Sequence, residues 1–151
     1  MPSQRKPVGD LGEILTTVFL AERVPQVIWV GSSNLEYDIV IPFPNGEIFQ
    51  KPTAISVKTR KKMKWKGMGI PPNKQKFEKT QTDLKTKGWD FWIALMLYSL
   101  KDNEMWFKIH LIPSDSITDE WFVGKERQIS IQRIEEEAKA NPRILTFASK
   151  G

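Results

Sequence analysis

Three polar residues in largely apolar surroundings, Asp38, Ser56 and Lys58, could together carry out chemistry. Asp38 lies within the apolar run Tyr37-Asp-Ile-Val-Ile41, where an unpaired buried carboxylate would be costly. Ser56 and Lys58 are two residues apart in a segment typical of a β-strand, so their side chains point to the same face. If the two strands pair, Asp38 can face Lys58.

These residue types suit the hydrolysis of a phosphodiester bond. Carboxylates that converge on one edge of a sheet are ligands for a hard cation such as Mg²⁺. Such a cation would contact a scissile phosphate and acidify the attacking water. Lys58 would orient that water or neutralise the charge that develops on the phosphate oxygens. Glu13, in the first expected helix, is a further candidate carboxylate.

The composition excludes several other kinds of site. The chain has no Cys, which excludes a disulfide scaffold, a Cys-based zinc site and a thiol nucleophile. Its single His, His110, excludes a multi-His zinc site and leaves little room for a Ser-His-Asp hydrolase. We expect His110 to be an ordinary strand histidine, so carboxylates and lysine remain as the groups available for hydrolysis.

The elements that must position these residues follow from hydrophobic periodicity and turn signals. We expect helices at residues 11–23, 74–87 and 130–140, and strands at residues 27–30, 35–41, 54–59, 91–100 and 104–112. The strand at residues 27–30 reads as buried, and the Lys-rich connection at residues 61–73 is long for a compact domain. This order predicts an α/β fold with a mixed sheet flanked by helices.

The length of 151 residues predicts a single domain with one hydrophobic core. We expect the core to span about residues 9–112, followed by a C-terminal helical extension over about residues 113–151. Neither a secretory signal nor an apolar segment long enough to span a membrane is visible. The chain is therefore expected to be intracellular and cytoplasmic, with no membrane partner.

The chain resembles the PD-(D/E)XK nuclease superfamily, of restriction-endonuclease-like fold, in three motifs taken in order. These are Gly9-Asp-Leu-Gly-Glu13, Tyr37-Asp-Ile-Val40 and Ile55-Ser-Val-Lys-Thr-Arg60. The nearest groups are archaeal Holliday-junction resolvases and small intron-encoded homing endonucleases of cyanobacteria. The resemblance covers residues 9–98 and implies hydrolysis of DNA with Mg²⁺ or Mn²⁺, commonly by a homodimer. Carried over by position, Asp38 is the metal-binding aspartate, Lys58 the motif lysine and Glu13 the helix carboxylate.

One motif position departs from the family pattern, because Ser56 stands where the family has Glu, Asp or Gln. A hydroxyl is a weaker cation ligand than a carboxylate. In a subgroup of restriction enzymes with Ser-x-Lys, a glutamate from the following helix fills the place. The corresponding candidate is Glu78, with a solvated helix residue as the alternative. In the resolvases a serine near this position contacts the site, so the resemblance makes Ser33 a further candidate for binding nucleic acid. The alternative is that Ser33 is a turn residue.

Positive charge is concentrated directly after the motif lysine. The segment at residues 58–88 holds eleven Lys/Arg and two acidic residues, whereas the rest of the chain has a net charge of −4. Such a block suits contacts with DNA phosphates, and Trp65 within it could stack on a base. The residues expected to bind nucleic acid in this segment are Arg60, Lys61, Lys62, Lys64, Trp65, Lys66, Lys74, Lys76 and Lys79.

Each site residue also has a structural interpretation. Glu13 follows Asp10 at the spacing of a capping box, and Asp38 could face solvent at a strand end. Lys58 could belong to a solvated row, and the Ser56 hydroxyl could bond to the backbone. The leading hypothesis is a Mg²⁺-dependent DNA endonuclease. The alternatives are a catalytically silent nucleic-acid-binding module of the same fold and an unrelated small α/β protein with a solvated basic helix.

Overall fold

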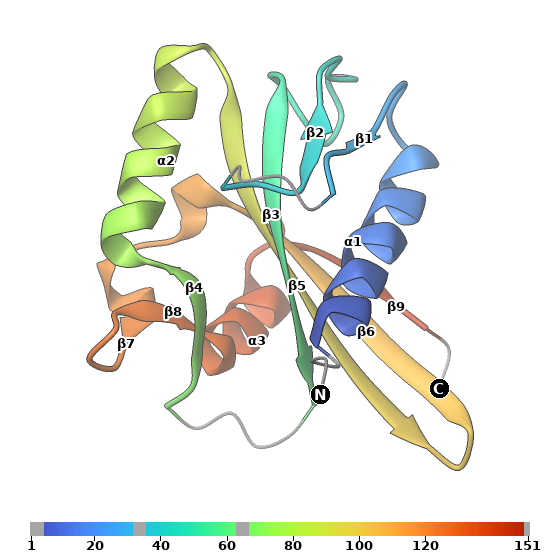
Figure 1. Ribbon diagram of the computed structural model, residues 1–151. Helices are drawn as coiled ribbons and strands as arrows, with labels where there is room; N and C mark the ends of the chain where they lie inside the picture. Colours follow the sequence, from blue (N-terminus) through green and yellow to red (C-terminus); the bar gives the residue numbers. More distant parts are fainter. Residues whose placement is uncertain (1–4, 32–35, 63–66, 150–151) are drawn as a thin grey trace.

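The computed structural model describes residues 5–31, 36–62 and 67–149 and has a mixed α/β fold, as the sequence predicts (Figure 1). The helices are α1 (Arg5–Ala21), α2 (Lys74–Thr86) and α3 (Ile131–Ala140), with short 3-10 helices η1 (Ser114–Ser116) and η2 (Asp119–Trp121). The strands are β1 (Ile28–Trp29), β2 (Ile39–Ile41), β3 (Thr53–Lys61), β4 (Gly69–Asn73), β5 (Asp90–Lys101), β6 (Glu104–Pro113), β7 (Phe122–Val123), β8 (Gln128–Ser130) and β9 (Leu145–Ala148).

The main sheet has the strand order β1-β2-β3-β5-β6-β9. Among the described strands of this sheet, β3 and β5 pair in parallel, with Ala54 opposite Phe91 and Lys58 opposite Leu95, and the other pairs are antiparallel. Parallel neighbours need a crossover, and here β4 and α2 provide it. A second, smaller sheet has the order β4-β8-β7.

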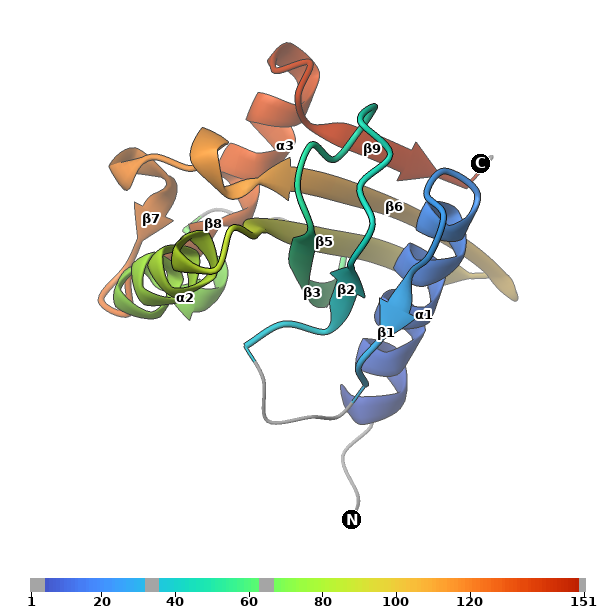
Figure 2. The same cartoon turned by 90° about the horizontal axis from the view of Figure 1, so that it is seen from above.

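Helices cover both faces of the main sheet. Figure 2 shows α1 on one face and α2, α3 and the small sheet on the other. The central strand β5 is therefore apolar on both faces: Ile93 and Leu95 pack towards α2 and α3, and Trp92 and Ala94 pack towards α1. The polar side chains considered below therefore lie not on β5 but on its neighbour β3, where Ser56 and Lys58 alternate with apolar residues.

The N-terminal part of the fold differs from the expected boundaries. α1 begins at Arg5, several residues before the expected start. β1 is shorter than expected and not buried, since Ile28 and Trp29 are each 42% exposed. It is an edge strand, so one of its sides has no neighbour in the sheet. β2 is also shorter than expected, with three residues, and this matters for the site.

The segment after Ile112 is not a helical extension. Besides α3 it contributes β7 and β8 to the small sheet and β9 to the main sheet, where Leu111 lies opposite Leu145. β4, within the expected connection at residues 61–73, pairs with β8. Pro71 and Pro72 make this strand hard to predict from the sequence, because proline has no backbone N–H to donate to a neighbouring strand. Proline is tolerated in an edge strand, and β4 is the edge of the small sheet.

The single histidine is an ordinary strand residue, as expected. His110 on β6 is 2% exposed, and its Nδ1 lies 2.8 Å from Thr146 Oγ1 on β9. Its Nε2 lies 2.9 Å from Oε2 of Glu135 on α3. Since an ionised carboxylate only accepts hydrogen bonds, Nε2 is the donor in that pair. The histidine thereby joins three elements of the fold.

Replacing Glu135 with glutamine is expected to reduce stability at neutral pH. The hydrogen bond from His110 lowers the pKa of Glu135 below its usual value, and Lys108, 3.6 Å away, acts in the same direction. Because the folded-state pKa is the lower one, the ionised carboxylate stabilises the fold above the unfolded-state pKa. This contribution is lost as the pH falls through the folded-state pKa. We expect Glu135→Gln to lower the free energy of unfolding by about 1–2 kcal/mol near neutral pH.

Urea unfolding of the native chain and of Glu135→Gln measures this difference at neutral and acidic pH. The two free energies of unfolding should converge in acid. Glu136→Gln, at the exposed neighbouring position, is the control and should change stability by less than about 0.5 kcal/mol. A Glu135→Gln variant as stable as the native chain at neutral pH would contradict the assignment.

Candidate active site

The short strand β2 exposes part of the β3 edge and places Asp38 there. β2 pairs with β3 between Ile39–Ile41 and residues 53–55, and no described strand lies beside the rest of that edge of β3. The backbone N–H of Asp38 donates to the Ile55 carbonyl at 2.8 Å. Its Oδ2 accepts a hydrogen bond of 2.8 Å from the Val57 N–H. Two bonds to β3 therefore hold the carboxylate where the β2–β3 pairing ends.

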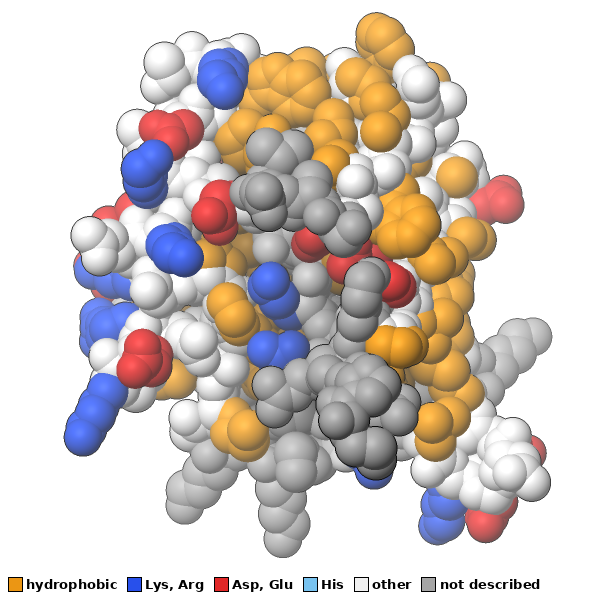
Figure 3. All heavy atoms as spheres, viewed as in Figure 1, with side chains coloured by type: hydrophobic (Ala, Val, Ile, Leu, Met, Phe, Trp, Pro, Cys, Tyr) orange, Lys and Arg blue, Asp and Glu red, His pale blue; other side chains and the backbone are white. Residues whose placement is uncertain are grey.

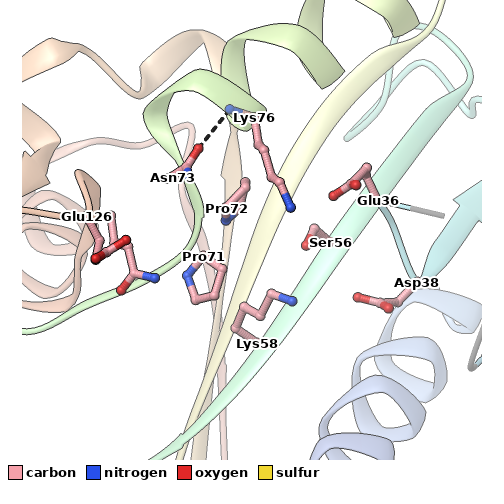
Figure 4. A pocket seen from close by; sticks show the side chains of 10 residues that line it. Glu36, Asp38, Ser56, Lys58, Pro71, Pro72, Asn73, Lys76 and Glu126 are labelled. Carbon is pink, nitrogen blue, oxygen red and sulfur yellow. Dashed lines mark hydrogen bonds between the residues drawn. The ribbon is translucent and has the colours of Figure 1, made fainter. Parts of the chain in front are cut away.

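A cavity of about 320 Å³ opens beside Asp38 (Figure 4). Strand β3 forms one wall, and the segment from β4 to the start of α2 forms another. The lining residues are Glu36, Asp38, Ser56, Lys58, Pro71, Pro72, Asn73, Lys76, Glu126 and Gln128. Tertiary pairing of β4 with β8 thus encloses a space that the local sequence around Asp38 does not indicate.

Ser56 and Lys58 both face this cavity from β3. They alternate with Ile55 and Val57, which pack towards α1. In Figure 4 the Lys58 side chain points towards Asp38, and Ser56 lies between Asp38 and Glu36. The expected juxtaposition of Asp38 with Lys58 is therefore present, and both residues lie on the same side of the sheet.

Glu13 lies in an adjoining cavity of about 640 Å³, which also has Asp38 and Lys58 in its wall. Its Oε1 accepts a hydrogen bond of 2.9 Å from Trp29 Nε1, which fixes the side chain of the helix carboxylate. The capping-box interpretation of Glu13 is wrong, because α1 begins at Arg5 and Asp10 lies inside the helix. Asp38, shared by both cavities, links Glu13 to Ser56.

Burial makes both carboxylates harder to ionise. It raises the pKa of Asp38, and the Val57 N–H and the charge of Lys58 oppose that rise. Burial also raises the pKa of Glu13; the Trp29 hydrogen bond opposes this, whereas the nearby Asp38 adds to it. A divalent cation between such groups would favour their ionised forms.

Glu78 does not reach this site. Phe77, Thr80 and Leu84 fix the buried face of α2, and this orientation turns Lys76 towards the cavity beside Asp38. Glu78 is 58% exposed at its side chain, and its Oε1 lies 3.8 Å from Lys74 Nζ. It belongs to a different surface hollow, so the expectation that α2 supplies a glutamate to the Asp38 pocket is corrected.

The expected nucleic-acid-binding residues fall into three groups. Lys76 lines the cavity beside Asp38, while Arg60 and Lys61 line the one beside Glu13. Lys62 lies over the Trp106 ring, with its Nζ 4.3 Å from the centroid. Lys74 and Lys79 form ion pairs with Asp119 and Asp83, at 3.2 and 2.9 Å. Four further residues, Ser33, Lys64, Trp65 and Lys66, lie outside the described residues.

Sequence reasoning missed Glu36. It lies two residues before Asp38 and lines the same cavity. A signal was present, because Glu36 and Asp38 lie two residues apart within the strand expected at residues 35–41, and such residues share a face of a strand. The carboxylate was overlooked because it precedes the apolar run that marks β2.

The donor set suits a hard cation. Within the described residues no group of three or more His, Asp or Glu side chains is placed to hold a metal ion. Mg²⁺, however, usually binds through one or two carboxylates and completes its shell with water and substrate phosphate. Glu36, Asp38 and the Ser56 hydroxyl line one cavity and fit that requirement, and the chain has no cysteine that would favour a soft metal.

Comparison with known proteins assigns no family. No protein-family model matches the chain, and no curated protein is significantly similar to it. In the part of the chain that the structure describes, no helix combines the length and apolar character needed to cross a bilayer. The functional argument therefore rests on the site itself.

Proposed function

We propose that the protein is a DNA endonuclease that hydrolyses phosphodiester bonds with Mg²⁺ or Mn²⁺, inside the cell. The observation that carries the proposal is the convergence of Asp38 and Lys58 on one cavity at the edge of β3. Resemblance of the motifs around Glu13, Asp38 and Lys58 to the PD-(D/E)XK nucleases supports the same conclusion. The α/β fold is compatible with that superfamily.

Each residue has a distinct task in this proposal. Asp38 and Glu13 would hold the cation, which when bound polarises the scissile phosphate and acidifies the attacking water. Lys58 would donate a hydrogen bond to that water or to a phosphate oxygen, where its charge offsets the negative charge that develops. The Val57 N–H keeps the Asp38 carboxylate in place during this step. The half-buried position of Lys58 strengthens its interaction with the phosphate.

The surrounding lysines and arginine would bind the DNA backbone. Lys/Arg side chains gather on the α2 side of the molecule, whereas the α1 side is largely apolar (Figure 3). Arg60, Lys61 and Lys76 line the two cavities and are the residues best situated for phosphates next to the cleaved bond. Phosphate contacts of this kind make binding weaken as salt is raised.

A cleavage assay tests the proposal. The chain is incubated with four-way junction, linear duplex and single-stranded DNA, each with Mg²⁺, Mn²⁺ or EDTA. We expect cutting of at least one DNA form that depends on the divalent cation and is lost in Lys58→Ala. Preference for the junction would indicate a resolvase, and cutting at one duplex site a sequence-specific enzyme. If no DNA form is cut under any of these conditions, the enzymatic proposal is wrong.

A second candidate is a catalytically silent nucleic-acid-binding module. Ser56 in place of the motif acid favours it, as does the small number of acidic groups at the site. This module would bind DNA equally well with EDTA and with Mg²⁺, and would cut none of the substrates. Binding curves recorded beside the cleavage assay distinguish the two candidates.

We also propose that the chain forms a homodimer through the outer face of α1. Leu11, Ile14 and Val18 recur along that face and are 37–54% exposed. Ile28 and Trp29 on the edge strand β1 extend the apolar surface. Contiguous apolar patches are unusual on monomers, and covering this one with a second copy would remove it from water.

Replacing Val18 with glutamate is expected to convert the dimer into a monomer. A charge at the centre of an apolar interface must be desolvated without a partner, which costs several kcal/mol. Light scattering during gel filtration measures the mass of each species. Leu100→Glu, at an exposed position on the β5–β6 hairpin, is the control and should remain dimeric. A native chain that is monomeric at all concentrations would exclude this interface.

A further inference from the structure

Ser56 is an unusual residue for its position. It is 3% exposed and lines the cavity beside Asp38, yet its hydroxyl forms no hydrogen bond with any other described residue. Buried polar groups are normally paired, because an unpaired one costs free energy. Ser56 as a whole is buried, and its hydroxyl lines a polar cavity with no partner among the described residues, so it is suited to a ligand in that cavity.

Glu36 brings a carboxylate to the same place. Figure 4 shows Ser56 between Glu36 and Asp38, with the oxygens of all three residues turned into the cavity. Glu36 lies before β2 and is exposed, and it forms no ion pair within 4 Å with another described residue. It shares the cavity with Lys58 and Lys76, and it also borders a hollow beside α2 that Lys79 lines.

The other glutamates near the site are less well situated for Ser56. Glu13 lines the adjoining cavity and is bonded to Trp29. Glu78 is paired with Lys74 over a different hollow. Glu126 lines the cavity from the opposite wall, and in Figure 4 it lies beyond Pro71, away from Ser56. Glu36 is therefore the described glutamate that faces Ser56 and Asp38 together.

We propose that Glu36 supplies the carboxylate that position 56 lacks, so that Glu36 and the Ser56 hydroxyl bind the divalent cation together with Asp38, which Glu13 flanks from the adjoining cavity. This inference rests on the proposed function, since it names a ligand of the cation that the nuclease would need. Three oxygen donors on one side of the cavity leave the other side for water and a phosphate oxygen, which is the usual arrangement for Mg²⁺.

The charges in the cavity agree with this assignment. The carboxylates of Glu36 and Asp38 share the cavity with two ammonium groups, that of Lys58 beside Ser56 on β3 and that of Lys76 at the start of α2. The lysines balance the carboxylates while the cavity is empty. Once a cation neutralises the carboxylates, both ammonium groups become available to the phosphate of a substrate. Cation and phosphate would then bind cooperatively, each improving the site for the other.

Binding of Mn²⁺ to the full chain without DNA tests the inference, with electron paramagnetic resonance detecting the free ion. We expect Glu36→Gln to weaken Mn²⁺ binding by at least about tenfold. Because Glu36 is exposed, this variant should fold normally, which circular dichroism checks. Glu126→Gln is the matched control: it removes the same charge from the opposite wall and should bind Mn²⁺ like the native chain.

A transfer of the carboxylate provides the second test. In Glu36→Gln combined with Ser56→Asp, the acid returns to the motif position, and Mn²⁺ affinity should recover towards the native value. If a folded Glu36→Gln variant binds Mn²⁺ like the native chain while Asp38→Asn does not, Glu36 is not a ligand, and the proposed function is unaffected. If the native chain neither binds Mn²⁺ nor cuts DNA, the proposed function itself fails, and this inference with it.

Discussion

Replacing Asp38 with asparagine is expected to abolish cleavage of DNA while leaving the fold intact. Asparagine keeps an oxygen that can accept the hydrogen bond from the Val57 N–H, so the local contact between Asp38 and β3 is preserved. The negative charge is lost, and with it the main ligand shared by the two cavities. We expect the cleavage rate to fall by about 10²–10³-fold or more, the size of effect seen when one preorganised electrostatic group is removed.

Single-turnover cleavage with Mg²⁺, together with DNA binding in EDTA, measures this effect. DNA binding should be unchanged or slightly stronger, because the substitution removes a negative charge from a surface that binds phosphate. Asp102→Asn is the control: it makes the same chemical change in the β5–β6 turn, where φ is 53° and asparagine is well tolerated. If Asp38→Asn cuts DNA at the native rate, Asp38 cannot hold an essential cation.

Replacing Gly12 with alanine is expected to destabilise the protein, although alanine is the better helix former. Gly12 is buried where α1 crosses β3, and a Cβ atom added there would overlap Thr59 Oγ1. Overpacking of this kind costs about 1–3 kcal/mol. The gain in helix propensity is about 1 kcal/mol. Because the overlap with Thr59 Oγ1 is severe, we expect the overpacking cost to lie near the top of its range and the free energy of unfolding to fall by about 2 kcal/mol.

Two further variants isolate the cause. Thr59 Oγ1 is buried and has no hydrogen-bond partner among the described residues, so Thr59→Ala should relieve the overlap and restore most of the stability lost in Gly12→Ala. Gly9→Ala, in the same helix, meets no atom within 4 Å and should be neutral or stabilising. Urea unfolding of the native chain, Gly12→Ala, Thr59→Ala and the double variant measures the coupling between positions 12 and 59. Equal destabilisation by Gly9→Ala would show that the α1–β3 contact is not responsible.

The contact between Gly12 and Thr59 affects the position of Glu13 as well as the stability of the protein. Glu13 is the next residue, and its bond to Trp29 holds β1 against α1. A shift of α1 away from β3 would move Glu13 relative to Asp38. We therefore expect Gly12→Ala to reduce cleavage as well, and Thr59→Ala to restore cleavage and stability together.

The amino-acid sequence by itself determined the class of fold and the central pair of the site. The alternation of Ser56 and Lys58 with Ile55 and Val57 assigned two polar side chains to one face of a strand, because the strand period is two. Asp38 could be identified as a candidate site residue because a carboxylate within an apolar run is costly to bury unless it has a partner or a ligand. The bounds predicted for β5 and β6 agree with the structure to within one residue at each end, because two long apolar segments joined by a short turn are typical of a β-hairpin.

Only the tertiary structure decided which other groups join Asp38, Ser56 and Lys58. The direction in which α2 faces depends on how Phe77 and Leu84 pack against the sheet, and that packing turned Lys76 towards the cavity instead of Glu78. The opposite wall forms because β4 pairs with β8, which lies far along the chain. Local periodicity carries no information about such long-range pairing. The position of Glu36 beside Ser56 has the same origin, because tertiary contacts and not the local sequence decide which side chains surround Ser56.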